Sequence, residues 1–302
     1  MKCFYHSADL DGKCSAAIVR RKYPDIELIG IDYGQPFPWD DITPDEAVIM
    51  VDFSLQPFGD MVRLSRVARL CWIDHHKSAL DEAKVAGWLS DRTLHEAATG
   101  KEAADLFVPG IRRDGIGACA QTWEYLYPGE EMPRAVHLLA EYDVWNHSDP
   151  DCLPFQYGSR LYDLKPENGM WEVLLMEPSQ TQEGLVDDGK IILEYQSQQN
   201  KGHARTLCFD AELGDLKVLA ANAGPTNSQF FDSLWDREKY HAMCLFQWRP
   251  KGGKWTVSLY SDRDDVDVSE ACKVRGGGGH KGAAGFQCAE VPFPLRTEKE
   301  QG

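Results

Sequence analysis

The sequence lacks the features that mark membrane, secreted and zinc-ribbon proteins. It has no apolar run long enough to cross a bilayer. The residues from Lys2 onward, KCFYHS, form no long apolar stretch and no cleavage site of a signal peptide. The nine cysteines are scattered and contain no C-x-x-C pair, which argues against a disulfide framework or a cysteine zinc site. We therefore expect a cytoplasmic protein that does not insert into a membrane.

Positive charge is also scarce. The chain carries 32 Lys and Arg against 48 Asp and Glu, a formal net charge of −16. A protein that binds duplex DNA normally has a basic face, because neutralising phosphates drives its affinity. Duplex DNA is therefore excluded as the expected partner. Either the substrate is not anionic, or the acidity is concentrated where metal ions reverse its sign.

The first half alternates apolar runs with helical patterns, which predicts an α/β fold with a parallel sheet and helices on both faces. Strands are predicted at Lys2–Ser7, Ile26–Tyr33, Ala47–Phe53 and Arg69–Asp74. Helices are predicted at Lys13–Tyr23, Pro57–Val67, Gly117–Tyr127 and from about Pro133 to Asp143. Residues Tyr157–Ser179 are rich in proline and glycine and are predicted to be irregular.

The last third has a different pattern, and we predict two domains with a cleft between them. Residues 1–180 would form the catalytic, metal-binding domain, and 181–206 a helical connector. Residues 207–302 would form a smaller, mixed α/β, substrate-binding domain. Its predicted elements are strands at Leu207–Ala211, Lys217–Asn222, His241–Trp248 and Trp255–Ser261, followed by a helix at Val268–Val274.

Acidic and histidine residues gather where the predicted parallel strands end, at the edge where open α/β sheets bind ligands. Three groups meet there: His6, Asp9 and Asp11; Asp52; and Asp74, His75 and His76. One such aspartate by itself could simply cap the next helix. Carboxylates packed this closely repel one another unless cations lie among them, so the convergence favours a metal site.

Aspartate and histidine together suit Mn²⁺, with Mg²⁺, Co²⁺ or Fe as alternatives. Two ions about 3.5–4 Å apart would hold the attacking and leaving oxygens of a phosphoryl displacement. Asp52 stands alone between the other two groups, so we expect it to bridge the two ions.

A run of four glycines near the end predicts a phosphate-binding segment, since backbone N–H groups can approach phosphate oxygens closely there. Arginine and histidine flank the run and add donors. The expected substrate-binding residues are Arg275, Gly277, Gly278, Gly279 and His280.

These motifs resemble those of the DHH phosphoesterases. His6–Gly12, Asp52 and Asp74-His75-His76 resemble motifs one to three, and Asp143 in EYDVW resembles motif four. The segment GGGGHKGAAGF resembles the GGGH signature of the DHH-associated C-terminal domain. The resemblance covers residues 2–286 approximately, and IDHHKSAL and EYDVW are most similar to the nanoRNase branch.

The resemblance implies a role for each residue. His6, Asp9 and Asp52 would hold one metal ion, and Asp11, Asp52, His75 and Asp143 the other. A hydroxide bridging the ions would attack the phosphorus. His76 would face the substrate phosphate, and Asp74 would fix the strand end or a ligand.

The implied activity is hydrolysis of very short RNA. The alternatives are a phosphoadenosine phosphate phosphatase, a cyclic dinucleotide phosphodiesterase, or a catalytically silent nucleotide-binding module. The expected partner is a short oligonucleotide or small nucleotide, and a homo-oligomer is compatible with the sequence. Many relatives have arginine where this chain has Tyr260, so either Arg263 compensates or the substrate is held differently.

Overall fold

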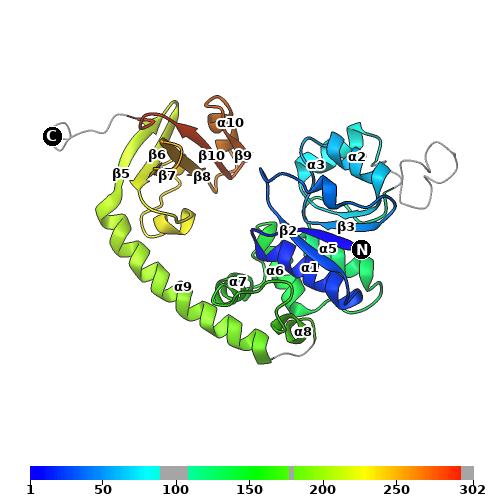
Figure 1. Ribbon diagram of the computed structural model, residues 1–302. Coiled ribbons are helices and arrows are strands. Elements are labelled where there is room, and N and C mark those ends of the chain that lie inside the picture. The colour runs from blue at the N-terminus through cyan, green and yellow to red at the C-terminus, as the bar shows by residue number, and fades with distance from the viewer. Residues whose placement is uncertain (89–107, 177–179, 294–302) are drawn as a thin grey trace, which may run out of the picture. The chain divides into compact units, whose positions relative to one another are not determined.

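The computed structural model describes residues 1–88, 108–176 and 180–293 (Figure 1). The chain divides into two compact units, Met1–Leu193 and Glu194–Gly302. One long helix, α9 (Gln180–Leu207), contributes residues to both units. Within the described residues, no helix combines the length and the apolar character needed to cross a bilayer.

The first unit is built on a parallel four-stranded sheet in the order β2-β1-β3-β4. Its strands are β1 (Lys2–His6), β2 (Glu27–Ile31), β3 (Ala47–Val51) and β4 (Arg69–Ile73). The predicted α/β fold with a parallel sheet is confirmed. Because the strands are parallel, their carboxyl ends meet along one edge of the sheet.

Alternate residues of the strands enter two separate cores, one on each face of the sheet. Phe4, Met50 and Trp72 pack under helices α2 (Gly59–Val67) and α3 (Lys77–Val85). The other face, with Cys3, Val51 and Ile73, shares a core with part of α9 and with five further helices. These are α1 (Leu10–Lys22), α5 (Ala118–Leu126), α6 (Arg134–Asp143), α7 (Cys152–Ser159) and α8 (Met170–Leu174). Figure 1 shows helices on both sides of this sheet.

The connection from β1 to α1 depends on Gly12. Asp9 caps α1 by accepting a hydrogen bond from the Gly12 N–H at 2.9 Å. A Cβ atom at position 12 would lie 2.1 Å from the His6 carbonyl oxygen. The backbone φ of Gly12 is not in the left-handed region. Glycine is required here because α1 begins in direct contact with the end of β1.

The second unit contains a mixed six-stranded sheet in the order β5-β6-β7-β8-β10-β9. The strands are β5 (Cys208–Leu213), β6 (Leu216–Asn222), β7 (Ala242–Arg249), β8 (Lys254–Tyr260), β9 (Gly278–His280) and β10 (Ala283–Cys288). Only β6 and β7 pair in parallel among these strands. The helix α10 (Val268–Lys273) covers one face, and a 3₁₀ turn, η2 (Ser228–Phe231), packs on the other.

Candidate metal centre

The carboxyl edge of the parallel sheet holds the predicted metal ligands. His6 is the last residue of β1, Asp52 follows β3, and His75 lies just beyond β4. The other three predicted ligands come from helix ends: Asp9 and Asp11 from the start of α1, and Asp143 from the end of α6. The structure brings all six together, in groups whose potential ligand atoms lie within 4.8 Å of one another.

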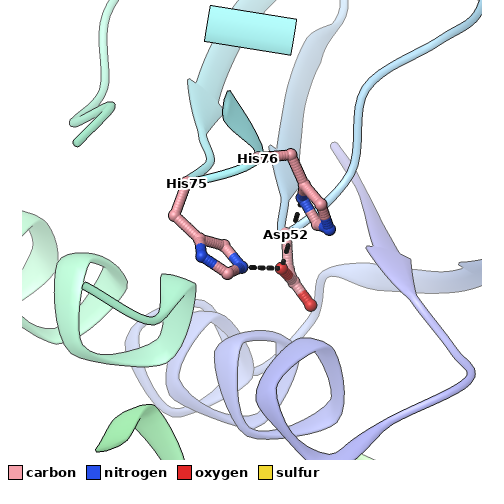
Figure 2. Close-up of side chains that lie close together, drawn as sticks. All are labelled: Asp52, His75 and His76. Atoms are coloured by element: carbon pink, nitrogen blue, oxygen red, sulfur yellow. Dashed lines mark ion pairs between the residues drawn. The ribbon is translucent and has the colours of Figure 1, made fainter. Parts of the chain in front are cut away.

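Asp52 lies at the middle of this cluster. Its Oδ2 is 3.7 Å from His6 Nδ1, and its Oδ1 is 3.2 Å from His75 Nε2. Figure 2 shows the Asp52 carboxylate between His75 and His76. His6 Nδ1 also lies 2.8 Å from Asp9 Oδ2, and His75 Nε2 lies 3.0 Å from Asp143 Oδ2. Two ligand groups therefore meet at one carboxylate, the arrangement that a residue shared between two ions requires.

The backbone at Asp52 is unusual. Its φ is 55°, in the left-handed region, and its side chain is 1% exposed. Aspartate and asparagine adopt this conformation more readily than other residues with side chains. Such positions cluster at functional sites, where the surrounding structure holds the residue in place.

Four buried atoms of the cluster make no well-aligned hydrogen bond with any described residue, although the two histidine nitrogens among them lie 2.8 and 3.0 Å from carboxylate oxygens. The four atoms are His6 Nδ1, both carboxylate oxygens of Asp52, and His75 Nε2. Buried polar atoms in folded proteins are almost always hydrogen-bonded, so each exception calls for an explanation. All four are atoms that ligate divalent metal ions, and they point at one another. The residues present therefore fit a metal site.

The charge distribution leads to the same inference. Burial, together with repulsion from Asp52 and Asp143, raises the pKa of Asp11 well above its usual value. Burial also raises the pKa of Asp52. Burial opposes the charged form of His6, but its contacts with Asp52 and Asp9 raise its pKa to about 11. Without a cation the cluster therefore retains protons, which a divalent ion would displace on binding.

Asp11 has a second role that the sequence did not indicate. Its two oxygens accept hydrogen bonds from the N–H groups of Ala118 and Cys119, at 2.6 and 2.8 Å. These residues begin α5, so the carboxylate sits at a helix N-terminus, where negative charge is stabilised. This contact fixes the carboxylate while leaving lone pairs for a metal ion. No local sequence pattern links residues 11 and 118.

Asp74 shapes the end of β4 and orients His76. It is fully buried, and its Oδ1 accepts hydrogen bonds from the backbone N–H groups of His75 and His76 at 2.7 and 3.1 Å. The same oxygen lies 2.7 Å from His76 Nδ1, while Trp72 Nε1 donates to Oδ2 at 3.3 Å. His76 is partly exposed. Its Nε2 is therefore the ring atom left to meet a substrate.

Asp32 is a residue that the sequence analysis missed. Its Oδ1 lies 3.2 Å from His6 Nε2. A carboxylate on the outer ring nitrogen of a ligating histidine fixes the ring orientation and the tautomer. Asp32 follows β2 and so lies at the same edge of the sheet as the predicted ligands. Its position directly after a predicted strand was the sequence signal that could have identified it.

A cavity of about 260 Å³ opens onto Asp9, Asp11 and Asp143. Its wall also includes Lys13 and Arg160. The Arg160 guanidinium donates to the Tyr142 hydroxyl at 3.1 Å. The metal cluster is thus open to a small anionic ligand from this side, with two cationic side chains close by.

The predicted substrate-binding residues lie in the second unit, around β9. A Cβ at Gly277 would lie 2.1 Å from the Gly285 carbonyl oxygen, and one at Gly279 would lie 2.5 Å from Ala284 Cα. Gly278 is exposed and a Cβ there would meet nothing within 4 Å, and His280 is exposed beside it. Two glycines of the run therefore serve the packing of β9 against β10, and Gly278 is open to a ligand.

The two arginines of this region already make contacts within the unit. Arg275 donates from Nη1 to the Ala271 carbonyl at 2.7 Å and lies 5.6 Å from the Phe286 ring centroid. Arg263 binds Asp265 through two donors, at 2.9 and 2.6 Å. Compensation by Arg263 for the arginine expected at position 260 stays a hypothesis.

The chain was compared with known proteins. No family model matches it. It is 27% identical over 259 residues to the uncharacterized protein R106 of Acanthamoeba polyphaga mimivirus, covering 83% of this chain and 55% of that protein. The chain thus spans about half the length of this curated relative.

Two solved structures share the fold. One is the pGpG-specific phosphodiesterase PggH of Vibrio cholerae, with a TM-score of 0.52, 14% identity, and coverage of 95% of this chain and 93% of that one. The other is the DHH domain of a member of a family of ribosomal proteins, with a TM-score of 0.54, 13% identity, and coverage of 94% and 81%. The protein therefore has the fold of a DHH-domain protein.

Proposed function

We propose that the protein is a metal-dependent phosphoesterase that hydrolyses short nucleotide phosphodiesters, as a nanoRNase does. The observation that carries this proposal is the cluster around Asp52, with four buried ligand atoms that lack well-aligned hydrogen bonds. The shared fold supports it, since one solved structure with this fold is named as a phosphodiesterase of a dinucleotide, pGpG.

We propose that the predicted ligands form two metal-binding groups that share Asp52. His6, Asp9 and Asp52 would hold one ion, and Asp11, Asp52, His75 and Asp143 the other, with Mn²⁺ as the expected metal and Mg²⁺, Co²⁺ or Fe as alternatives. When bound, such ions polarise the phosphoryl group and lower the pKa of water to near neutral.

His76 would bind the phosphate. Burial opposes its charged form, but the hydrogen bond to Asp74 and the charge of that carboxylate raise the pKa of His76 above its usual value. When both ring nitrogens carry a proton, the ring can donate from Nε2 to a phosphoryl oxygen. Asp74 holds Nδ1 and fixes the direction of that donor.

The acidic surface fits a small substrate. A net charge of −16 repels long polyanions, whereas a short nucleotide needs only a local positive site. The metal ions and Lys77 would supply it in the first unit, and Arg275 and Lys281 carry positive charge in the second unit.

The test is an assay of the purified protein with Mn²⁺ on RNA dimers to five-mers, phosphoadenosine phosphate, and cyclic di-AMP and di-GMP. We expect mononucleotides from short RNA, and no product after chelation of the metal. Phosphate release from phosphoadenosine phosphate alone, or cleavage of the cyclic dinucleotides alone, would assign one of the alternative activities. Metal binding without turnover of any substrate would favour a silent nucleotide-binding module.

Gly278→Ala tests the phosphate-binding role of the glycine run. A methyl group there has open space around it, so the free energy of unfolding should change by less than about 0.5 kcal/mol. It would keep a phosphate from approaching the backbone, so we expect KM for an RNA dimer to rise about tenfold, as for the loss of one charge-assisted hydrogen bond. Steady-state kinetics and urea unfolding measure the two effects.

Gly224→Ala is the matched control, since a Cβ there also meets nothing within 4 Å and the residue lies outside the glycine run. Equal KM values for the two variants would remove Gly278 from the proposed substrate site.

A further inference from the structure

An aromatic cavity adjoins the metal cluster within the first unit. It encloses about 490 Å³ and is lined by the segments that follow β2 and β3. Four aromatic side chains contribute to its wall: Tyr33, Phe37, Trp39 and Phe53. Cavities that bind small organic ligands enclose about 300–1,000 Å³ and are mostly apolar with a few polar groups. This cavity has the size of such a site, and it combines aromatic side chains with polar groups.

Tyr33, on the wall of this cavity, lies next to the predicted metal ligand His6 and next to His76. The Tyr33 ring centroid is 5.5 Å from that of His6 and 6.0 Å from that of His76, both in edge-on orientations. It is also 4.7 Å from the Phe53 ring. A group bound against Tyr33 would therefore lie beside the place where a phosphate would meet the ions.

Tyr33 is placed to receive a ligand. It is 37% exposed, although it sits among aromatic neighbours. At the rim, Gln56 offers an amide and Asp60 a carboxylate. An aromatic face with hydrogen-bonding groups at its margin matches a planar heterocycle whose edge carries donors and acceptors.

We propose that this cavity binds the nucleobase of the nucleotide whose phosphate lies at the metal cluster, with Tyr33 as its stacking platform. The inference rests on the proposed function, because it names the part of the substrate that the first unit recognises. Stacking accepts every base, since each has a π face. The site would thus distinguish nucleotides from other phosphate esters without reading sequence.

The test compares the binding of adenosine 5′-monophosphate and ribose 5-phosphate to the full-length, Mn²⁺-loaded protein by calorimetry. The two ligands share sugar and phosphate and differ only in the base. We expect the nucleotide to bind about 5- to 150-fold more tightly, the range for stacking one base on an aromatic side chain. Tyr33→Leu should remove most of this preference, and Tyr33→Phe should keep it.

Tyr23→Leu is the matched control, because Tyr23 lies in the same unit and is 36% exposed. If Tyr33 only supported His6 and the metal, Tyr33→Leu would weaken both ligands equally and leave their ratio unchanged. That result would overturn the proposal, as would equal binding of both ligands to the wild-type protein, a comparison that requires no variant to fold.

The two proposals fail separately. Hydrolysis of short RNA without a base-dependent preference would leave the proposed function standing and remove the nucleobase site. A preference carried by Tyr33, without hydrolysis of any phosphoester, would do the reverse.

Discussion

Asp52→Asn is expected to lower kcat/KM for an RNA dimer by roughly 1,000-fold or more, because metal ions supply several kcal/mol of transition-state stabilisation. The substitution keeps the volume of the side chain and tolerates its left-handed backbone, with φ at 55°. It removes a carboxylate that contacts both His6 and His75. Calorimetry should show weaker binding of Mn²⁺ and fewer ions bound, while circular dichroism should show an intact fold.

Asp45→Asn is the control for this variant. Asp45 also has a positive φ, 63°, but it is exposed and lies at the opposite end of β3. Any effect of replacing an aspartate in this backbone conformation appears in both variants, and only the metal-related loss is specific to Asp52. Full Mn²⁺ binding and full turnover by Asp52→Asn would contradict the bridging role.

Gly12→Ala should damage the fold and the site together. The new methyl carbon would lie 2.1 Å from the His6 carbonyl oxygen, a backbone atom that can move only if β1 and α1 separate. We expect a loss of about 3 kcal/mol in the free energy of unfolding. His6, Asp9 and Asp11 flank this contact, so Mn²⁺ affinity should fall with it. Urea unfolding with and without metal measures both effects.

Gly59→Ala provides the comparison, since Gly59 begins α2 and a Cβ there meets nothing within 4 Å. Alanine is a better helix former than glycine, so this variant should be as stable as the wild type or slightly more so. If Gly12→Ala were equally stable, the close approach of α1 to β1 would not be needed for the fold.

The sequence was enough to predict which strand ends converge, because this prediction rests on the geometry of a parallel sheet. Parallel strands align their carboxyl ends, so residues that follow β1, β3 and β4 had to converge wherever those strands formed. His6, Asp52 and His75 follow from this rule. Asp143 does not, since nothing in the pattern of α6 points its end toward the sheet. Only the motif resemblance suggested it.

Other features depend on contacts that have no local signal. The hydrogen bonds from Ala118 and Cys119 to Asp11 join distant segments, and they appear only when α5 packs against α1.

Two elements were not predicted from the sequence. The glycine run was predicted to bind phosphate and was assigned no strand, yet its last two residues and His280 form β9, because the absence of a side chain at Gly279 lets the strand lie close to β10. The segment Tyr157–Ser179 was predicted to be irregular, but it contains the end of α7 and the short helix α8. There the packing of Trp171 and Leu174 into the core outweighs the local turn signals.

The dispersal of the ligands along the chain has a consequence for folding. His6, Asp52, His75 and Asp143 come from four segments that only the completed sheet and its helices bring together. An unfolded chain cannot gather them, so if they bind metal as proposed, nearly all of the binding free energy would appear as added stability of the native state. Metal availability in the cell would then set the lifetime of this protein as well as its activity.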